Sequence, residues 1–173
     1  MAIGKSSKAT DVMATAVGYG TKASNQYSSA IGYQSVASGV QSTAVGSDVE
    51  TTGDYSLATG NHAAASGDYS AAVGYKSKST EEYAFAAGNE AVASGNSALA
   101  VGSLAKASGK DAIANGHSAI ADGEASIAIG RNASALGNSA VAQGNDTLAD
   151  IPNSVAIGSN SVTDAAVGTS TMQ

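Results

Sequence analysis

The sequence predicts an all-β fold, a parallel β-solenoid of about twelve coils with fourteen residues in each coil. Three observations carry this prediction: a glycine recurs every fourteen residues, an alanine stands two residues before each of these glycines, and a second, weaker glycine position follows seven residues later. Self-similarity at a fixed period is typical of solenoids. The twelve main glycines are Gly4, Gly18, Gly32, Gly46, Gly60, Gly74, Gly88, Gly102, Gly116, Gly130, Gly144 and Gly158.

Each coil is expected to contain two short strands and two corners. The segments before each glycine position are about five residues long and place small residues at alternate positions, which is the period of a strand. Glycine at the end of each segment is expected to supply the unusual backbone angles of a tight corner. A heptad coiled coil shares the seven-residue period, but glycine in the repeated position excludes it.

The composition excludes several classes of protein. The chain has no Cys or Trp, one Phe, 21 Gly and a net charge of −6. Its basic residues form no stripe, so nucleic acid is not an expected partner. No apolar run approaches the roughly 20 residues that span a bilayer, so we expect no direct membrane insertion by this segment. No signal peptide is visible after Met1, and any export or anchoring parts are expected to lie outside these residues.

The two faces of each strand are expected to differ. Positions four and two before the main glycine are small, as in Ser28 and Ala30, and should point into the coil. Only methyl and hydroxymethyl groups are expected to fit there, because a two-stranded coil is flat. The outward positions of the second strand of each coil are mostly polar, as in Lys22 and Ser24, and are expected to face water.

The outward positions of the first strand are apolar along the whole chain. Soluble monomers rarely expose an apolar face of this length, so other copies of the chain are expected to cover it. Symmetry alone does not choose between a dimer and a trimer. Asn115 and Gln143 on this face could set the register between copies, hold an ion, or be solvated defects. The predicted packing face comprises Ile3, Val17, Ile31, Val45, Leu57, Val73, Phe85, Leu99, Val101, Ile113, Asn115, Ile127, Ile129, Val141, Gln143, Val155 and Ile157.

Segments such as 153–158 (Asn-Ser-Val-Ala-Ile-Gly) and 27–32 (Tyr-Ser-Ser-Ala-Ile-Gly) resemble the head repeats of trimeric autotransporter adhesins. The resemblance covers residues 1–160, a YadA-like head. It implies a left-handed parallel β-roll, a homotrimer, and a location on the outer membrane surface of a Gram-negative bacterium. Residues 161–173 are similar to a shortened or divergent neck, because Ser161 opens a Ser-Val-Thr-Asp sequence but the next Ala-Val-Gly ends four residues early.

The resemblance implies an adhesin head that attaches to host extracellular matrix or cell-surface molecules. The candidate contact residues are a tyrosine column at one corner, Tyr27, Tyr55, Tyr69 and Tyr83, and the tyrosines just after the main glycines, Tyr19, Tyr33 and Tyr75. Exposed Tyr is a good contact residue. These rings could instead only cover the corners. An inert spacer or fibre segment is the alternative function. Ice binding is a third possibility, raised by the Ser/Thr column from Thr10 to Ser108 but opposed by interrupting Lys and Glu residues.

No catalytic, cofactor or metal site is predicted. His62 and His117 lie four coils apart, or roughly 19 Å at the spacing of parallel strands, and a metal site needs three or four converging ligands. The acidic residues are dispersed over different coils, so no carboxylate pair at glycosidase spacing is implied. We therefore expect a protein that is not an enzyme.

Overall fold

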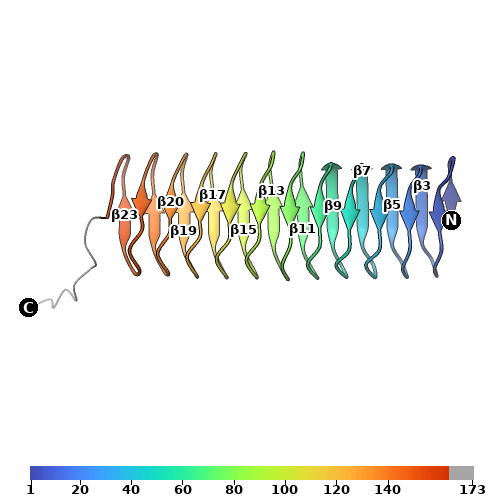
Figure 1. Cartoon of the computed structure of the whole chain (residues 1–173), viewed down its shortest axis with the longest axis horizontal. Helices are drawn as coiled ribbons and strands as arrows, with labels where there is room; N and C mark the ends of the chain where they lie inside the picture. The colour runs from blue at the N-terminus through green and yellow to red at the C-terminus, as the bar shows by residue number, and fades with distance from the viewer. Residues whose placement is uncertain (164–173) are drawn as a thin grey trace, which may run out of the picture.

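The computed structural model describes residues 1–163, which form a straight rod of stacked coils (Figure 1). The strands lie across the long axis of the rod, and the first and last strands lie at opposite ends of it. All strand pairs are parallel, and each of the first eleven coils contributes one strand to each of two sheets. The predicted parallel β-solenoid is therefore confirmed. The part of the predicted neck from residue 164 onward lies outside the described residues.

The odd-numbered strands form a twelve-stranded sheet, here called the first sheet. Its strands are β1 (Ala2–Ile3), β3 (Thr15–Tyr19), β5 (Ser29–Tyr33), β7 (Thr43–Ser47), β9 (Leu57–Asn61), β11 (Ala71–Val73), β13 (Phe85–Ala87), β15 (Leu99–Val101), β17 (Ile113–Asn115), β19 (Ile127–Ile129), β21 (Val141–Gln143) and β23 (Val155–Ile157).

The even-numbered strands form an eleven-stranded sheet, here called the second sheet. Within the described residues the twelfth coil has no strand of this sheet; a single parallel bridge joins Val162 to Leu148 there. The strands are β2 (Lys8–Ala9), β4 (Lys22–Ala23), β6 (Val36–Ala37), β8 (Glu50–Thr51), β10 (Ala64–Ala65), β12 (Lys78–Ser79), β14 (Val92–Ala93), β16 (Lys106–Ala107), β18 (Ile120–Ala121), β20 (Ser134–Ala135) and β22 (Leu148–Ala149).

The register between coils is fourteen residues throughout. Ala16 pairs with Ala30, and Ala30 pairs in turn with Ala44. The second sheet keeps the same register, with Lys8 opposite Lys22. Because each residue has its equivalents above and below it, every outward position forms a continuous column along the rod.

The interior is built from small side chains, as predicted. Alanines of both sheets, such as Ala100 on β15 and Ala107 on β16, are completely buried. Some buried serines bond to the backbone of their own corner: the hydroxyl of Ser42 donates to the carbonyl oxygen of Gly39 at 2.8 Å. The expectation that only methyl and hydroxymethyl groups fit was too narrow, because Val49 is also fully buried.

The two glycine positions have different roles, which corrects one expectation. The main glycines have positive φ, 141° at Gly88 for example, and the predicted role in the corner angles is confirmed there. The second glycines, such as Gly95, do not have positive φ. A Cβ at Gly95 would lie 2.0 Å from the carbonyl oxygen of Gly109 in the next coil. Close approach between coils, rather than backbone angle, therefore favours glycine at the second position.

The replacement Gly88→Ala is expected to destabilise the rod more than Gly95→Ala. Both new methyl groups meet a backbone oxygen of the next coil, at 2.3 Å and 2.0 Å respectively. Only Gly88→Ala also holds a side chain at φ near 141°, a region essentially confined to glycine, which costs about 1–3 kcal/mol. Glu81 already occupies the position equivalent to Gly95 one coil earlier.

Urea unfolding of both variants at one protein concentration tests this difference. We expect the free energy of unfolding to fall by about 2 kcal/mol more for Gly88→Ala than for Gly95→Ala. Equal losses would show that close approach alone excludes side chains from both positions.

Candidate ligand-contact and packing surfaces

The predicted packing residues all lie on the outer face of the first sheet or at its ends. Ile31, Leu57 and Phe85 are about 40% exposed in the single chain. Val45, Val73, Leu99, Val101, Ile113, Ile127 and Val141 are half-buried by their neighbours in the same column. The structure therefore places these side chains on one face of the rod, here called the apolar strip. The strip is apolar over most of its length, whereas the sequence predicted an apolar face over the whole length.

Polar side chains interrupt this strip in both halves of the rod. In the N-terminal half they are Thr15, Ser29, Thr43 and Thr59. In the C-terminal half they are Asn115 and Gln143. Asn115 pairs in register with Val101 on one side and Ile129 on the other, and Gln143 follows Ile129. Both polar side chains are exposed in the single chain. They lie two coils apart, or about 10 Å at the spacing of parallel strands.

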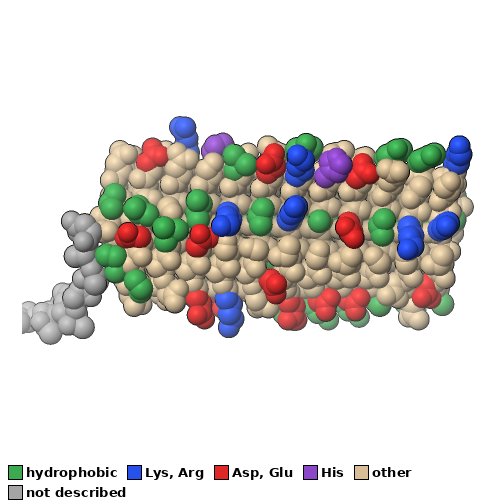
Figure 2. All heavy atoms as spheres, viewed as in Figure 1, with side chains coloured by type: hydrophobic (Ala, Val, Ile, Leu, Met, Phe, Trp, Pro, Cys, Tyr) green, Lys and Arg blue, Asp and Glu red, His purple; other side chains and the backbone are tan. Residues whose placement is uncertain are grey.

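The outer face of the second sheet has a different character. Its columns mix Lys, Glu, Val and Ala, as in the register Lys22, Val36, Glu50 along β4, β6 and β8. Figure 2 shows a row of this kind, in which charged and apolar side chains follow one another along the rod. This face is suited to water, as the sequence predicted.

Every corner of the rod places a residue in the left-handed backbone region. The four tyrosines of the candidate contact column occupy such positions, with φ of 58° at Tyr27, 57° at Tyr55, 56° at Tyr69 and 58° at Tyr83. Positive φ is uncommon for residues other than glycine. The backbone here is held by the neighbouring coil: the N–H of Tyr69 donates to the carbonyl oxygen of Asp54 at 2.8 Å.

Three of the four tyrosines in the candidate contact column form a stack on consecutive coils. The ring centroids of Tyr55 and Tyr69 are 5.0 Å apart, and those of Tyr69 and Tyr83 are 5.2 Å apart, with nearly parallel planes. We call these three residues the tyrosine ladder. Each ring is about half exposed. Tyr27 lies at the same corner but outside the ladder, because Gln41 occupies the coil between it and Tyr55.

A row of carboxylates runs beside the tyrosine ladder. Asp54, Asp68 and Glu82 each precede one of its tyrosines. The N–H of Asp54 donates to Oδ1 of Asp68 at 2.8 Å, so one carboxylate caps the backbone of the neighbouring coil. The negative charge of Glu82 is the main cause that raises the pKa of the Tyr83 phenol above its ordinary value. This row was not predicted from the sequence, although its fourteen-residue spacing is visible there.

A second group of aromatic residues lies at the opposite corner, after the main glycines. Tyr19 and Tyr33 stack at 5.4 Å, and the ring of Tyr75 meets His62 edge-on at 6.5 Å. The ammonium group of Lys76 lies 5.1 Å from the centroid of Tyr75. This distance is within the range of a cation–π interaction.

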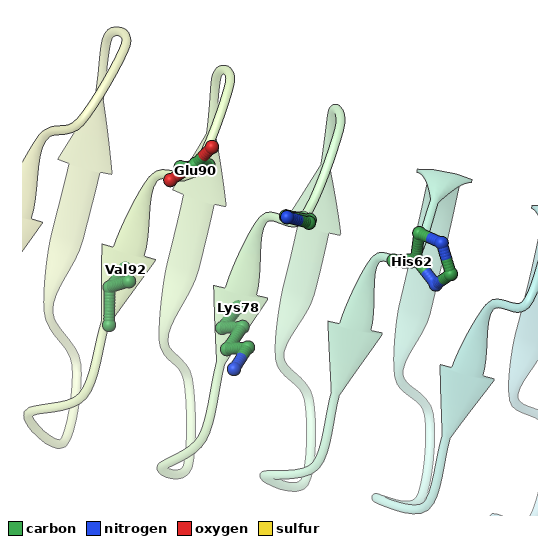
Figure 3. Close-up of a pocket in the computed structure, with 5 residues that line it drawn as sticks. His62, Lys78, Glu90 and Val92 are labelled. Atoms are coloured by element: carbon green, nitrogen blue, oxygen red, sulfur yellow. The ribbon is translucent and has the colours of Figure 1, made fainter.

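An open hollow of about 460 Å³ lies beside this second group, between the corner and the second sheet (Figure 3). His62, Lys76, Lys78, Glu90 and Val92 line it, from successive coils. The labelled side chains of His62, Lys78, Glu90 and Val92 are spread along the rod rather than converging on one point. The hollow is therefore a surface depression between columns rather than an enclosed ligand pocket.

Within residues 1–163, no three His, Cys, Asp or Glu side chains are grouped closely enough to bind a metal ion. The same part of the chain has no helix with the length and hydrophobicity needed to cross a bilayer.

Comparison with known proteins identifies the repeats. The family model of the YadA head domain repeat matches residues 1–21, 23–48, 52–77, 79–105, 107–133, 131–149 and 135–161. Comparison with curated proteins gives no match. The matches of the family model follow the coils of the rod from its first strand to its last. The chain therefore belongs to the YadA head repeat family, the repeats that build the heads of trimeric autotransporter adhesins.

Proposed function

We propose that this chain is the head of a homotrimeric adhesin on the outer membrane surface of a Gram-negative bacterium, where it attaches to host extracellular matrix or cell-surface molecules. The observation that carries the proposal is the apolar strip on the first sheet. A mostly apolar strip along twelve strands is larger than the apolar patches that soluble monomers usually expose. Three copies packed by their first sheets around a common axis would cover it.

In this arrangement the second sheets and the corners stay on the outside of the trimer, where they can contact host molecules. The corner tyrosines Tyr27, Tyr55, Tyr69 and Tyr83 are the proposed contact residues, since each presents a half-exposed ring with a hydroxyl. Binding spread over three identical chains gains avidity without a deep pocket. The proposed role is therefore attachment rather than catalysis.

Light scattering coupled to size exclusion tests the assembly, and adhesion to matrix-coated surfaces tests the function. We expect a mass three times 16.7 kDa and retention on at least one matrix coating. The matched variant replaces the four corner tyrosines by Ser, which the structure already accommodates at the equivalent corner in Ser97 and Ser139. We expect this variant to keep the trimer mass and lose adhesion about tenfold.

Two results would contradict the proposal. A stable monomer would leave the apolar strip uncovered and remove the assembly. A trimer that adheres to no host matrix or cell surface would favour the alternative, an inert spacer that holds another domain away from the cell.

A further inference from the structure

The tyrosine ladder differs from the other aromatic groups of the rod in its charge environment. The three corner segments that carry it, residues 52–56, 66–70 and 80–84, contain four carboxylates and no Lys, Arg or His. The carboxylates are Asp54, Asp68, Glu81 and Glu82. Figure 2 shows acidic side chains gathered beside apolar ones along one edge of the rod.

The stacking geometry determines which parts of the rings a partner can reach. Rings 5.0 and 5.2 Å apart cover each other's faces, so the ladder presents ring rims, hydroxyl groups and the outer faces of Tyr55 and Tyr83. Long basic side chains suit such a surface. Their methylene groups can pack against the apolar ring rims while the charged group pairs with an oxygen atom. The carboxylates of the three corner segments supply such oxygen atoms.

The opposite corner shows that a tyrosine of this rod can accept a cation. Lys76 places its ammonium group 5.1 Å from the ring centroid of Tyr75. The charged residues of the three corner segments that carry the ladder are all acidic. These segments therefore supply no cation of their own to the ladder rings.

We propose that the tyrosine ladder and its four carboxylates form a docking surface for a Lys- or Arg-rich protein segment. That this segment belongs to the host rests on the proposed function above. Successive rungs lie about 4.8 Å apart, so the ladder is about 10 Å long. An extended peptide places side chains of one face about 6.8 Å apart, so two basic side chains can engage the ladder together. The association is charge-assisted and weakens as salt is added.

Fluorescence anisotropy with a labelled deca-lysine peptide and the full chain tests this inference. The ring variant carries Tyr55→Ser, Tyr69→Ser and Tyr83→Ser, and its control carries Tyr19→Ser and Tyr33→Ser. The control pair is also stacked, but the segments that carry it, residues 18–21 and 32–35, contain no carboxylate. We expect about tenfold weaker binding for the ring variant, because the basic side chains lose their contacts with three rings, and less than about a twofold change for the control.

A charge variant separates specific docking from general attraction. It converts the four ladder carboxylates to amides, which retain the acceptor oxygen of Asp68 that caps the neighbouring coil. Its matched control makes the same change in net charge elsewhere, through Asp111→Asn, Asp122→Asn, Glu124→Gln and Asp146→Asn. We expect about tenfold weaker binding for the ladder variant and about twofold or less for its control.

Two results would overturn the inference: unchanged binding by the ring variant, or equal losses for the two charge variants. The matrix-adhesion assay, run on the same variants, distinguishes failure of the docking surface from failure of the adhesin function. A chain that binds deca-lysine through the ladder but adheres to no matrix contradicts only the adhesin. A chain that adheres while its ladder variants bind deca-lysine normally contradicts only the docking surface.

Discussion

The replacement Ala100→Leu should destabilise the rod by about 3 kcal/mol or more, because the interior of a coil has no room for a larger side chain. Ala100 lies on β15, is completely buried, and pairs in register with Ala86 and Ala114. The largest buried side chain of the rod is Val49. A leucine would have to push the two sheets apart and break the hydrogen bonds to both neighbouring coils.

The conservative change Ala98→Ser provides the control for this variant. Ser28, Ser42 and Ser56 occupy the equivalent interior position, and the hydroxyl of Ser56 donates to the carbonyl oxygen of Gly53 at 2.6 Å. A serine at position 98 has the corresponding carbonyl of Gly95 available, so we expect a change below about 1 kcal/mol. Thermal unfolding at one protein concentration measures both. Similar midpoints for the two variants would contradict an interior limited by size.

The double replacement Ile31→Lys and Ile129→Lys should convert the proposed trimer into monomers. Both isoleucines lie on the outer face of the first sheet, on β5 and β19, and are about 40% exposed in the single chain. Packing around an axis would bring three new ammonium groups together at each of two levels. Burying such unpaired like charges costs several kcal/mol at each level.

The matched control places lysines on the same two coils but on the second sheet, through Val36→Lys on β6 and Ser134→Lys on β20. Val36 pairs in register with Lys22 and Glu50, in a column that already carries charge. Light scattering should give the monomer mass for the first-sheet variant and the trimer mass for the control. Monomers in both cases, or trimers in both, would contradict packing through the first sheet.

Much of the candidate site was predictable because of the repeat. The outward position of Ile31 and the inward position of Ala30 follow from strand alternation, and both were predicted correctly. The corner tyrosines were also found, but the prediction treated Tyr27 as equal to the others. Stacking needs rings on adjacent coils, and Gln41 separates Tyr27 from Tyr55. The row of Asp54, Asp68 and Glu82 was not predicted, although each of the three directly precedes a corner tyrosine at the fourteen-residue spacing.

The sequence by itself determined the period, the strands, and the inner and outer columns of this protein. It could do so because each residue of a solenoid has its equivalents fourteen positions before and after it as neighbours, so that the contacts can be inferred from the repeat. Only the tertiary structure decided the conformation of the corners. Gly88 has positive φ and Gly95 does not, although a Cβ at either position would collide with a carbonyl oxygen of the next coil. Tyr69 adopts left-handed angles between two stacked rings. Backbone angles and ring planes depend on the distance between coils, which residue spacing does not specify.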